Sequence, residues 1–335
     1  MNAKTSEKVD LFIHNDELLM RKFPGWIAAN VFLGAYLYTN RNKTPDPEKI
    51  KTCKKLLRKT FGVFSHMRGY VEPVIIIRMS MRDDPEEYIN GVNSLLSSVS
   101  KSRLLTSEYD VLCAMIIYEN KDRYDVSALI EKMRSVYASM QKNHPVITGK
   151  EDLTTALMFA MLDEEPEALL QEMEACYALL KPKFRLGIGL IQTMSALMAV
   201  MKGTPEEKVS RVNAIIDALK ARKLNYKGSR SLPVLAGLLA SSRSPEELAD
   251  DVKAIADSLK GQAGFGVFRL GKEGRMQYAV MLLISSERFE DSSDSLTNTL
   301  MSIVEQQIIN FMMMMTFIMI SSSTHTVVSS SSSGK

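Results

Sequence analysis

One helical pattern recurs along this chain of 335 residues. After Pro166, apolar residues stand at offsets of 3, 4, 7, 10, 11 and 14, which is the spacing of one face of an α-helix. The same pattern starts at seven origins that lie 38 to 48 residues apart, and only Lys208 interrupts its strong copies. A period near 40 residues is typical of stacked helical repeats. The origins are Pro47, Pro85, Val126, Pro166, Pro205, Pro245 and Ser293.

The residues around each origin have the features of a helix start. The residue before it is mostly one whose side-chain oxygen can accept from the free N–H groups of a first turn. Proline fits the next position because its missing N–H would have no partner there. We therefore predict that an outer helix begins at each origin. The preceding residues are Asp46, Asp84, Asp125, Glu165, Thr204, Ser244 and Ser292.

A more apolar segment, such as "DVLCAMIIY" or "TTALMFAML", precedes each origin. A helix that is apolar on most sides is buried, so we place these segments inside. Each inner helix and the outer helix after it form a hairpin that cannot cover its own apolar face, whereas stacked hairpins bury a continuous core. The sequence therefore predicts an all-α fold, an α-solenoid of about seven helical hairpins with a period near 40 residues.

The pattern divides the chain into four parts. We expect residues 1–25 to form a capping helix and residues 26–305 to form the helical-hairpin repeat domain. Residues 306–320 read as a hydrophobic C-terminal helix, and residues 321–335 as a disordered Ser-rich tail. The apolar run is thirteen residues long, whereas a spanning helix needs about 20. Packing along the last hairpin is therefore favoured, with a partner-docking helix or membrane association through 308–328 as alternatives.

Composition argues against several functions. The 42 basic and 39 acidic residues are too evenly balanced to indicate nucleic-acid binding, and the basic run at 51–59 is interpreted as a solvated helix face. The three cysteines lie far apart without a CxxC pair, which fits a reducing compartment. The charged N-terminal segment lacks the pattern of a signal peptide, so we expect a cytoplasmic protein.

Motifs of catalysis are not found in the sequence. It contains no phosphate-binding G-x-x-x-x-G-K-[ST] loop, no G-x-S-x-G elbow and no H-E-x-x-H pair. We therefore expect no cofactor, no metal and no catalytic residue, and a role as an enzyme is not favoured.

Arg78 lies in the middle of an otherwise apolar inner segment. A buried arginine must be paired or must face a groove. Glu72 is the expected partner if it is paired, and a guanidinium that faces a ligand is the alternative. Arg68 and Gly69 stand at the turn just before this segment.

Polar residues also recur near the starts of inner segments. On a concave surface they would ring one edge, where a peptide or a small polar ligand could bind, although capping is the commoner role for acids at helix starts. The candidate ligand-binding residues are Arg68, Arg78, Glu108, Asp110, Asp152, Gln192, Arg230 and Arg275.

The motif "FSHMRG", the forty-residue helical units and the hydrophobic, then Ser-rich, C-terminus occur together here. This combination resembles an uncharacterised family of cytoplasmic proteins from Firmicutes, which is catalogued as a domain of unknown function. The resemblance extends over nearly the whole chain. It implies an all-helical fold and no assigned activity.

The function predicted from these features is that of a non-catalytic helical-repeat protein that binds a protein or peptide partner on its concave face. One alternative is an enzyme with an Arg/carboxylate pocket inside a closed helical ring, and another is a membrane-associated protein attached by its tail. A deep pocket that holds Arg78 with two or more carboxylates would favour the enzyme. An open groove with exposed apolar side chains would favour binding.

Overall fold

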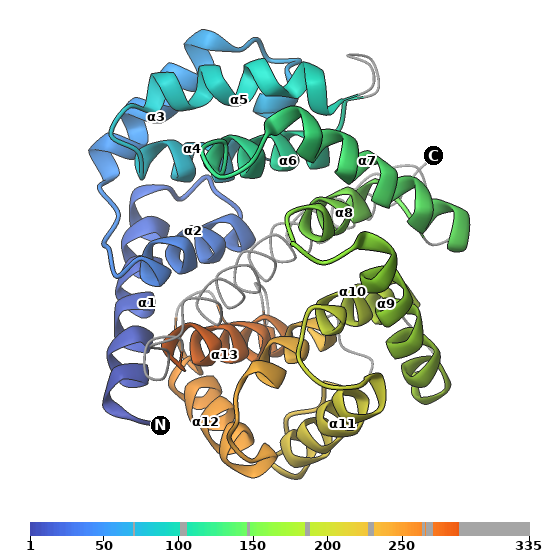
Figure 1. Cartoon of the computed structure of the whole chain (residues 1–335). Coiled ribbons are helices and arrows are strands. Elements are labelled where there is room, and N and C mark those ends of the chain that lie inside the picture. The colour runs from blue at the N-terminus through green and yellow to red at the C-terminus, as the bar shows by residue number, and fades with distance from the viewer. Residues whose placement is uncertain are drawn as a thin grey trace, which may run out of the picture. The chain divides into compact units, whose positions relative to one another are not determined.

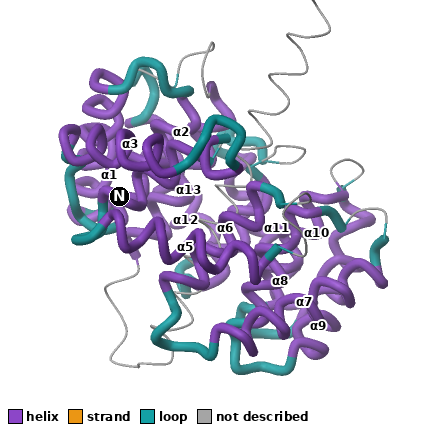
Figure 2. The backbone as a smooth tube through the Cα atoms, turned by 90° about the horizontal axis from the view of Figure 1, so that it is seen from above, coloured by secondary structure: helices purple, strands orange, loops and turns teal. Residues whose placement is uncertain are grey.

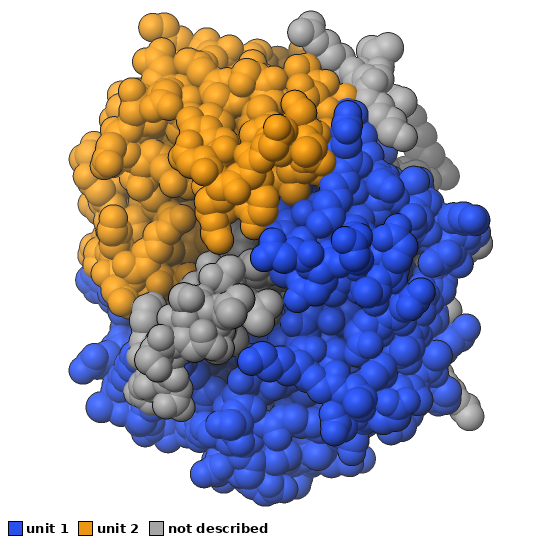
Figure 3. Space-filling model, in the orientation of Figure 1, with its two compact units in different colours: residues 1–14, 131–309 blue, residues 15–130, 310–335 orange. Residues whose placement is uncertain are grey.

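The computed structural model describes residues 1–69, 71–100, 106–145, 148–184, 188–226, 231–262, 265 and 271–287. Within these ranges every regular element is helical and no strand occurs (Figure 1, Figure 2), so the all-α prediction is confirmed. The chain divides into two compact units (Figure 3). Unit 1 comprises residues 1–14 and 131–309, and unit 2 comprises residues 15–130 and 310–335.

The outer helices begin where the sequence predicts. In α9 the six buried residues stand at the six predicted offsets, from Leu169 to Leu180. Ser293, the seventh origin, lies outside the described residues. The six described outer helices are α3 (Pro47–Thr60), α5 (Pro85–Val99), α7 (Val126–Asn143), α9 (Pro166–Leu180), α11 (Pro205–Ala221) and α12 (Pro245–Ser258).

Side-chain caps explain most of these starts. The Asp46 carboxylate accepts from two backbone N–H groups of the first turn of α3, and Asp84 does the same in α5. Thr204 forms a reciprocal capping box with Glu207, which satisfies two otherwise free N–H groups. Glu165 makes no such bond, so the start of α9 depends on the proline at its first position and on packing.

The apolar segments form the inner helices. One of them, η5 (Leu232–Ala240), is a 3₁₀-helix. Gly237 in its interior disfavours the α-helix, whereas Pro233 stands in the first turn, where proline is tolerated. Within unit 2, α2 packs on α4 and α3 packs on α5, and within unit 1, α10 packs on η5 and α9 packs on α11. The inner α-helices are α2 (Ala28–Asn40), α4 (Glu72–Ser80), α6 (Glu108–Glu119), α8 (Leu153–Ala160), α10 (Ile188–Ala199) and α13 (Gly271–Glu287). Short 3₁₀ turns lie at η1 (His66–Arg68), η3 (Lys150–Asp152) and η4 (Lys181–Lys183).

The N-terminal helix α1 (Ala3–Lys22) has two sets of contacts. In unit 1, the ring of Phe12 stacks on that of Tyr278 of α13 with centroids 5.3 Å apart. In unit 2, the amide of Asn15 donates to the hydroxyl of Thr39 of α2 at 3.0 Å. The predicted capping helix therefore contacts α13 with its first half and α2 with its second half.

The predictions for the C-terminal helix and tail stay predictions. Residues 306–320, the tail 321–335 and the segment 308–328 lie outside the described residues. Among the helices that are described, none combines the length and the apolar character needed to cross a membrane.

Lys208, which interrupts the apolar pattern of α11, is held by an ion pair. Its side chain is only 3% exposed, and its ammonium lies 2.7 Å from the carboxylate of Glu172 on α9. A buried ammonium without such a partner would strongly destabilise the fold. The interruption of the apolar pattern of α11 is therefore compensated by an ion pair to α9.

This pair predicts an order of stability. Lys208→Met should change the free energy of unfolding by less than about 1 kcal/mol, because an apolar side chain of similar length restores the pattern. Glu172→Ala should lower it by about 1–3 kcal/mol, because it leaves the ammonium buried without a partner. Urea unfolding followed by circular dichroism measures both changes. A larger loss in Lys208→Met than in Glu172→Ala would contradict this account.

Candidate functional site

Arg78, the first predicted site residue, is internally paired in unit 2. Its side chain is 2% exposed on α4, and its guanidinium pairs with Glu119 at the end of α6. The expected pairing with Glu72 is therefore wrong. Glu119 also accepts from Arg82 at 2.8 Å and from the hydroxyl of Tyr88 at 2.8 Å.

The electrostatics of this cluster hold Glu119 in its ionised form. Burial alone would raise the pKa of Glu119, but the charges of Arg78 and Arg82 and the hydrogen bond from Tyr88 together hold it below its ordinary value. Because these donors already engage the carboxylate, the cluster serves as a buried link between α4, α5 and α6.

Arg68 and Glu108 lie near the turn that precedes α4. Arg68 donates from Nη1 to the carbonyl of Phe61 at 3.3 Å, and its Nε lies 3.7 Å from the carboxylate of Glu72. Glu108 begins α6, which packs on η1. A Cβ added to Gly69 would lie 3.4 Å from a carboxylate oxygen of Glu108. Both predicted residues therefore border the same turn.

Two predicted acids cap helix starts. Asp110 accepts from the backbone N–H of Ser107 at 2.7 Å, and Asp152 accepts from that of Gly149 at 3.0 Å. Burial raises the pKa of Asp152 to about 7, although the Gly149 hydrogen bond opposes the shift. Both acids act locally in the way that the capping alternative describes.

The remaining predicted residues are not brought together with these. Gln192 is buried in unit 1 and donates to the hydroxyl of Thr148 at 3.3 Å. Arg275 is partly exposed on α13. Arg230 lies outside the described residues. The predicted set is thus divided between the two units.

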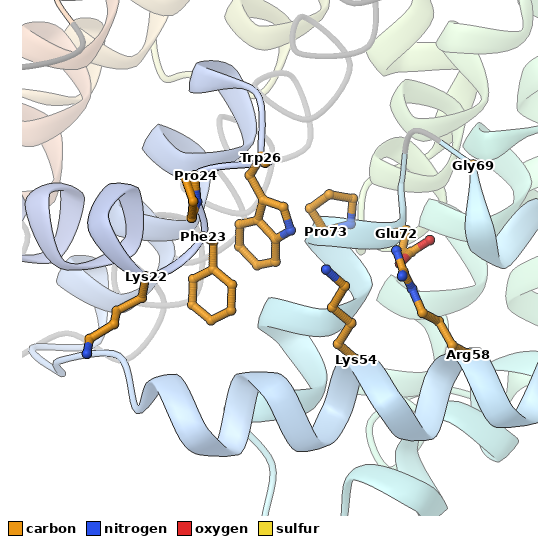
Figure 4. Close-up of a pocket in the computed structure, with 10 residues that line it drawn as sticks. Lys22, Phe23, Pro24, Trp26, Lys54, Arg58, Gly69, Glu72 and Pro73 are labelled. Atoms are coloured by element: carbon orange, nitrogen blue, oxygen red, sulfur yellow. The ribbon is translucent and has the colours of Figure 1, made fainter.

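A pocket of about 360 Å³ opens in unit 2 beside Gly69 (Figure 4). Three chain segments line it: the end of α1 with the turn that follows, the second half of α3, and the residues at the start of α4. Its volume is in the range of sites that bind small ligands or single side chains.

Phe23 and Trp26 form the aromatic wall of the pocket (Figure 4). The backbone N–H of Trp26 donates to the carbonyl of Phe23 at 2.9 Å, which closes a turn with Pro24 and Gly25 at its centre. The turn stacks the two rings at 4.6 Å with an interplanar angle of 19°. Phe23 is buried and Trp26 is partly exposed, so the packed ring fixes the orientation of the accessible one.

The other walls are basic. Lys54 and Arg58 come from α3 (Figure 4), and Lys22 comes from the end of α1. Glu72 is the one carboxylate among the described lining residues, and the Nε of Arg58 lies 2.7 Å from it. Three cations and one carboxylate give the lining a net charge of +2. Such a lining favours an anionic group.

The sequence prediction reached only the edge of this pocket, through Arg68 and Gly69. It missed Trp26 and the pocket-facing residues of α3. Two signals in the sequence point to Trp26: a Pro-Gly pair with an aromatic residue on each side, and the single tryptophan of the chain. The basic run at 51–59 is a solvated face only in part, because Lys54 and Arg58 line the pocket.

The described part of the chain holds neither a metal-ligand cluster nor an accessible cysteine thiol. No three His, Cys, Asp or Glu side chains there are grouped so that they could hold a metal ion. Cys53, Cys113 and Cys176 are free and buried. Burial raises the pKa of Cys53 and of Cys176 to about 11, so these thiols are protonated at neutral pH.

The fold and the pocket define an all-helical protein with a basic, aromatic pocket. The profile of the family described as "Protein of unknown function (DUF4003)" matches residues 22–320, so the chain belongs to this family. The predicted resemblance to an uncharacterised domain of unknown function is thereby confirmed. No curated protein and no solved structure matches the chain.

The Arg78 cluster predicts a pH-dependent stability. Glu119→Gln should lower the free energy of unfolding at pH 7 by about 3–5 kcal/mol, because Arg78 stays buried without a carboxylate. The folded pKa of Glu119 lies below the unfolded one, so its contribution is complete above about pH 4.5 and is lost as the pH falls through the folded pKa. Denaturant unfolding at several pH values should show the wild type and the variant converging at acid pH.

The control is Glu48→Gln, which removes a carboxylate from an exposed surface pair. It should change stability by less than about 0.5 kcal/mol. An unchanged gap between wild type and Glu119→Gln from neutral to acid pH would refute the role of the ionised carboxylate.

Asp152 predicts the opposite pH dependence. Its folded pKa of about 7 lies above the ordinary 3.8, so the folded state binds the proton more tightly. Stability should therefore decrease as the pH rises from about 4 to 7 and then level off. Asp152→Asn cannot ionise and should gain stability relative to the wild type over that interval. Equal slopes for both proteins in urea unfolding from acid to neutral pH would show that Asp152 ionises normally.

Proposed function

We propose that this protein is a non-catalytic binding protein built from stacked helical hairpins with a period near 40 residues. In this proposal the pocket of unit 2 binds an acidic segment of a protein or peptide partner. The observation that carries it is a partly exposed tryptophan beside three cations and a single, already paired carboxylate.

Equivalent hydrogen bonds support the stacked arrangement. Lys132 and Arg211 each stand six residues after an origin. Lys132 donates to the carbonyl of Leu162 at 2.9 Å, and Arg211 donates to that of Ser241 at 2.6 Å. Both acceptors stand four residues before the next origin. Stacked repeats are expected to make the same contact at the same place in successive units.

The shape of the pocket supports a short segment as the ligand. Trp26 offers a flat apolar surface, and the ring of Phe23 behind it limits the side-chain entropy that binding would cost. A volume of about 360 Å³ accommodates one or two side chains. An aromatic or aliphatic side chain could pack on Trp26 while an adjacent carboxylate meets Lys54.

The charged groups favour binding over catalysis. Glu72 is engaged by Arg58 and Arg68, whereas general acid–base chemistry needs a group that is free to exchange a proton with a substrate. Arg78, on which the enzyme alternative depends, is buried against Glu119 and does not line the pocket. That a protein or peptide partner docks on the concave face stays a prediction.

The proposed site of action is the cytoplasm. Three free, buried cysteines are compatible with a reducing compartment. Membrane association through 308–328 stays an alternative prediction.

A peptide-selection experiment tests this function. A random peptide library is selected on the wild type and counter-selected on a Trp26→Ala, Lys54→Glu double variant. The enriched peptides should carry an aromatic or aliphatic residue next to acidic ones, because the pocket is apolar on one side and basic on the others. Trp26 is the only tryptophan, so its fluorescence reports directly on binding at the pocket.

Lys54→Glu should weaken the binding of the selected peptides by at least about tenfold. The matched control is Lys43→Glu, which reverses the charge of an exposed lysine of unit 2 that does not line the pocket. Its affinity should stay close to that of the wild type. No enrichment, enrichment of basic peptides, or equal affinity for Lys54→Glu would contradict the proposal.

A further inference from the structure

The turn between α3 and η1 displays two large apolar side chains to solvent. The N–H of Ser65 donates to the carbonyl of Gly62 at 3.0 Å, so Val63 and Phe64 occupy the centre of a β-turn. Phe64 is 98% exposed and Val63 is 66% exposed. Turn centres usually carry small or polar residues. Folding of the turn itself therefore does not account for these two side chains.

Hydrogen bonds hold the backbone of this turn in place. Arg68 donates from Nη1 to the carbonyl of Phe61 at 3.3 Å, just before the turn. The N–H of Met67 donates to the hydroxyl of Ser65 at 3.2 Å, just after it, and the Met67 side chain is buried. The backbone is thus anchored on both sides, while the apolar side chains at its tip project outward.

The helix that leads into this turn carries a row of lysines. Lys51, Lys55 and Lys59 are exposed and stand four residues apart, on one side of α3. The row is about 12 Å long and ends four residues before Val63. Lys51 pairs with Glu48, but both groups are exposed and the pair contributes little. Overall α3 contains six basic residues and one acidic residue.

We propose that the lysine row and the Val63–Phe64 turn together bind the surface of an anionic lipid bilayer. Lysines close to negatively charged lipids are attracted electrostatically, and apolar side chains beside them can enter the interfacial region. Each signal is weak alone, and stable membrane attachment commonly combines two. The contact is peripheral and uses none of the residues that line the pocket of unit 2.

A bilayer fits this surface better than a protein partner does. A side chain that projects from a turn needs a partner that yields to it, and the lipid interface requires no preformed cavity. A protein would have to supply a hydrophobic pocket for Phe64 and carboxylates at matching distances along α3. Nucleic acid would meet the lysines but leaves Val63 without a role, because stacking on bases uses aromatic side chains.

Sedimentation of the full chain with vesicles tests the proposal. The wild type should bind vesicles of phosphatidylcholine mixed with phosphatidylglycerol, bind vesicles of phosphatidylcholine alone much less, and release as salt is raised. Replacing all three lysines of the row by glutamine should lower the bound-to-free ratio by about tenfold or more, and so should Phe64→Ser. The control replaces Lys202, Lys220 and Lys260, three exposed lysines of unit 1, by glutamine. It should bind as the wild type does.

Insertion is measured separately at residue 64. Phe64→Cys can be labelled selectively with a polarity-sensitive dye, because the native cysteines are buried. The dye emission should shift to the blue when anionic vesicles are added. Since Phe64 is almost fully exposed, Phe64→Ser should leave the unfolding free energy unchanged, and this control separates lost binding from misfolding.

Five results would overturn the proposal. Equal binding to neutral vesicles would remove the role of the lysine row. Binding that survives both sets of substitutions, as attachment through the C-terminal segment would produce, would place the contact elsewhere. A label at residue 64 that stays in water would exclude insertion. Binding to a single-stranded oligonucleotide or to an acidic protein in place of vesicles would show that the surface has a different partner.

Discussion

A helix that is apolar over most of its surface is stable in water only when other helices cover it. The inner helix α4 shows the extent of this requirement, because eight of its nine residues are buried. It packs against α2, α3 and α5 within unit 2. The outer helices supply the cover through one apolar face each, as the buried residues of α3 and α5 show. Their remaining surface is then free to take on other roles.

Ion pairs between the packed helices fix how these helices align. Apolar contacts are non-directional, so they do not by themselves fix which part of one helix meets which part of the next. The ion pairs Arg78–Glu119 and Lys208–Glu172 join α4 to α6 and α11 to α9. A shift of these helices along one another would leave the buried Arg78 and Lys208 without partners. We interpret these pairs as determinants of how the helices align more than as sources of stability.

The all-helical composition and the starts of the outer helices were predictable because their signals are local. An acceptor side chain, a proline and a helical apolar spacing occur within about 15 residues of each other, and each acts through the first turns of a single helix. The contacts between helices were harder to predict. Arg78 pairs with a residue 41 positions away, whereas the candidate Glu72 was chosen because it is near in sequence. Likewise, η5 is a 3₁₀-helix where an α-helix was expected, and Gly237 in its interior is a weak helix former.

The pocket was harder to predict than the fold because its lining comes from three separate segments. No pattern within any one of them shows that Trp26, Lys54 and Glu72 meet, since that depends on how α3 and α4 pack after the turn at Pro24. The predicted polar ring relied on helix starts, where acids such as Asp110 and Asp152 turned out to be engaged as caps. A local role was sufficient to explain those acids.

The helix α3 contributes residues to the core, to the pocket and to the lysine row. At about 100° per residue, its buried residues occupy one sector of the helix, its pocket residues the next sector, and its lysine row the sector after that. The core residues are Ile50, Cys53 and Leu57, the pocket residues are Lys54 and Arg58, and the row is Lys51, Lys55 and Lys59. Because the last two sectors adjoin, a bilayer bound along the row would lie beside the pocket. A partner segment held on Trp26 would then be recruited to the lipid surface, which links the two proposed contacts through a single rigid helix.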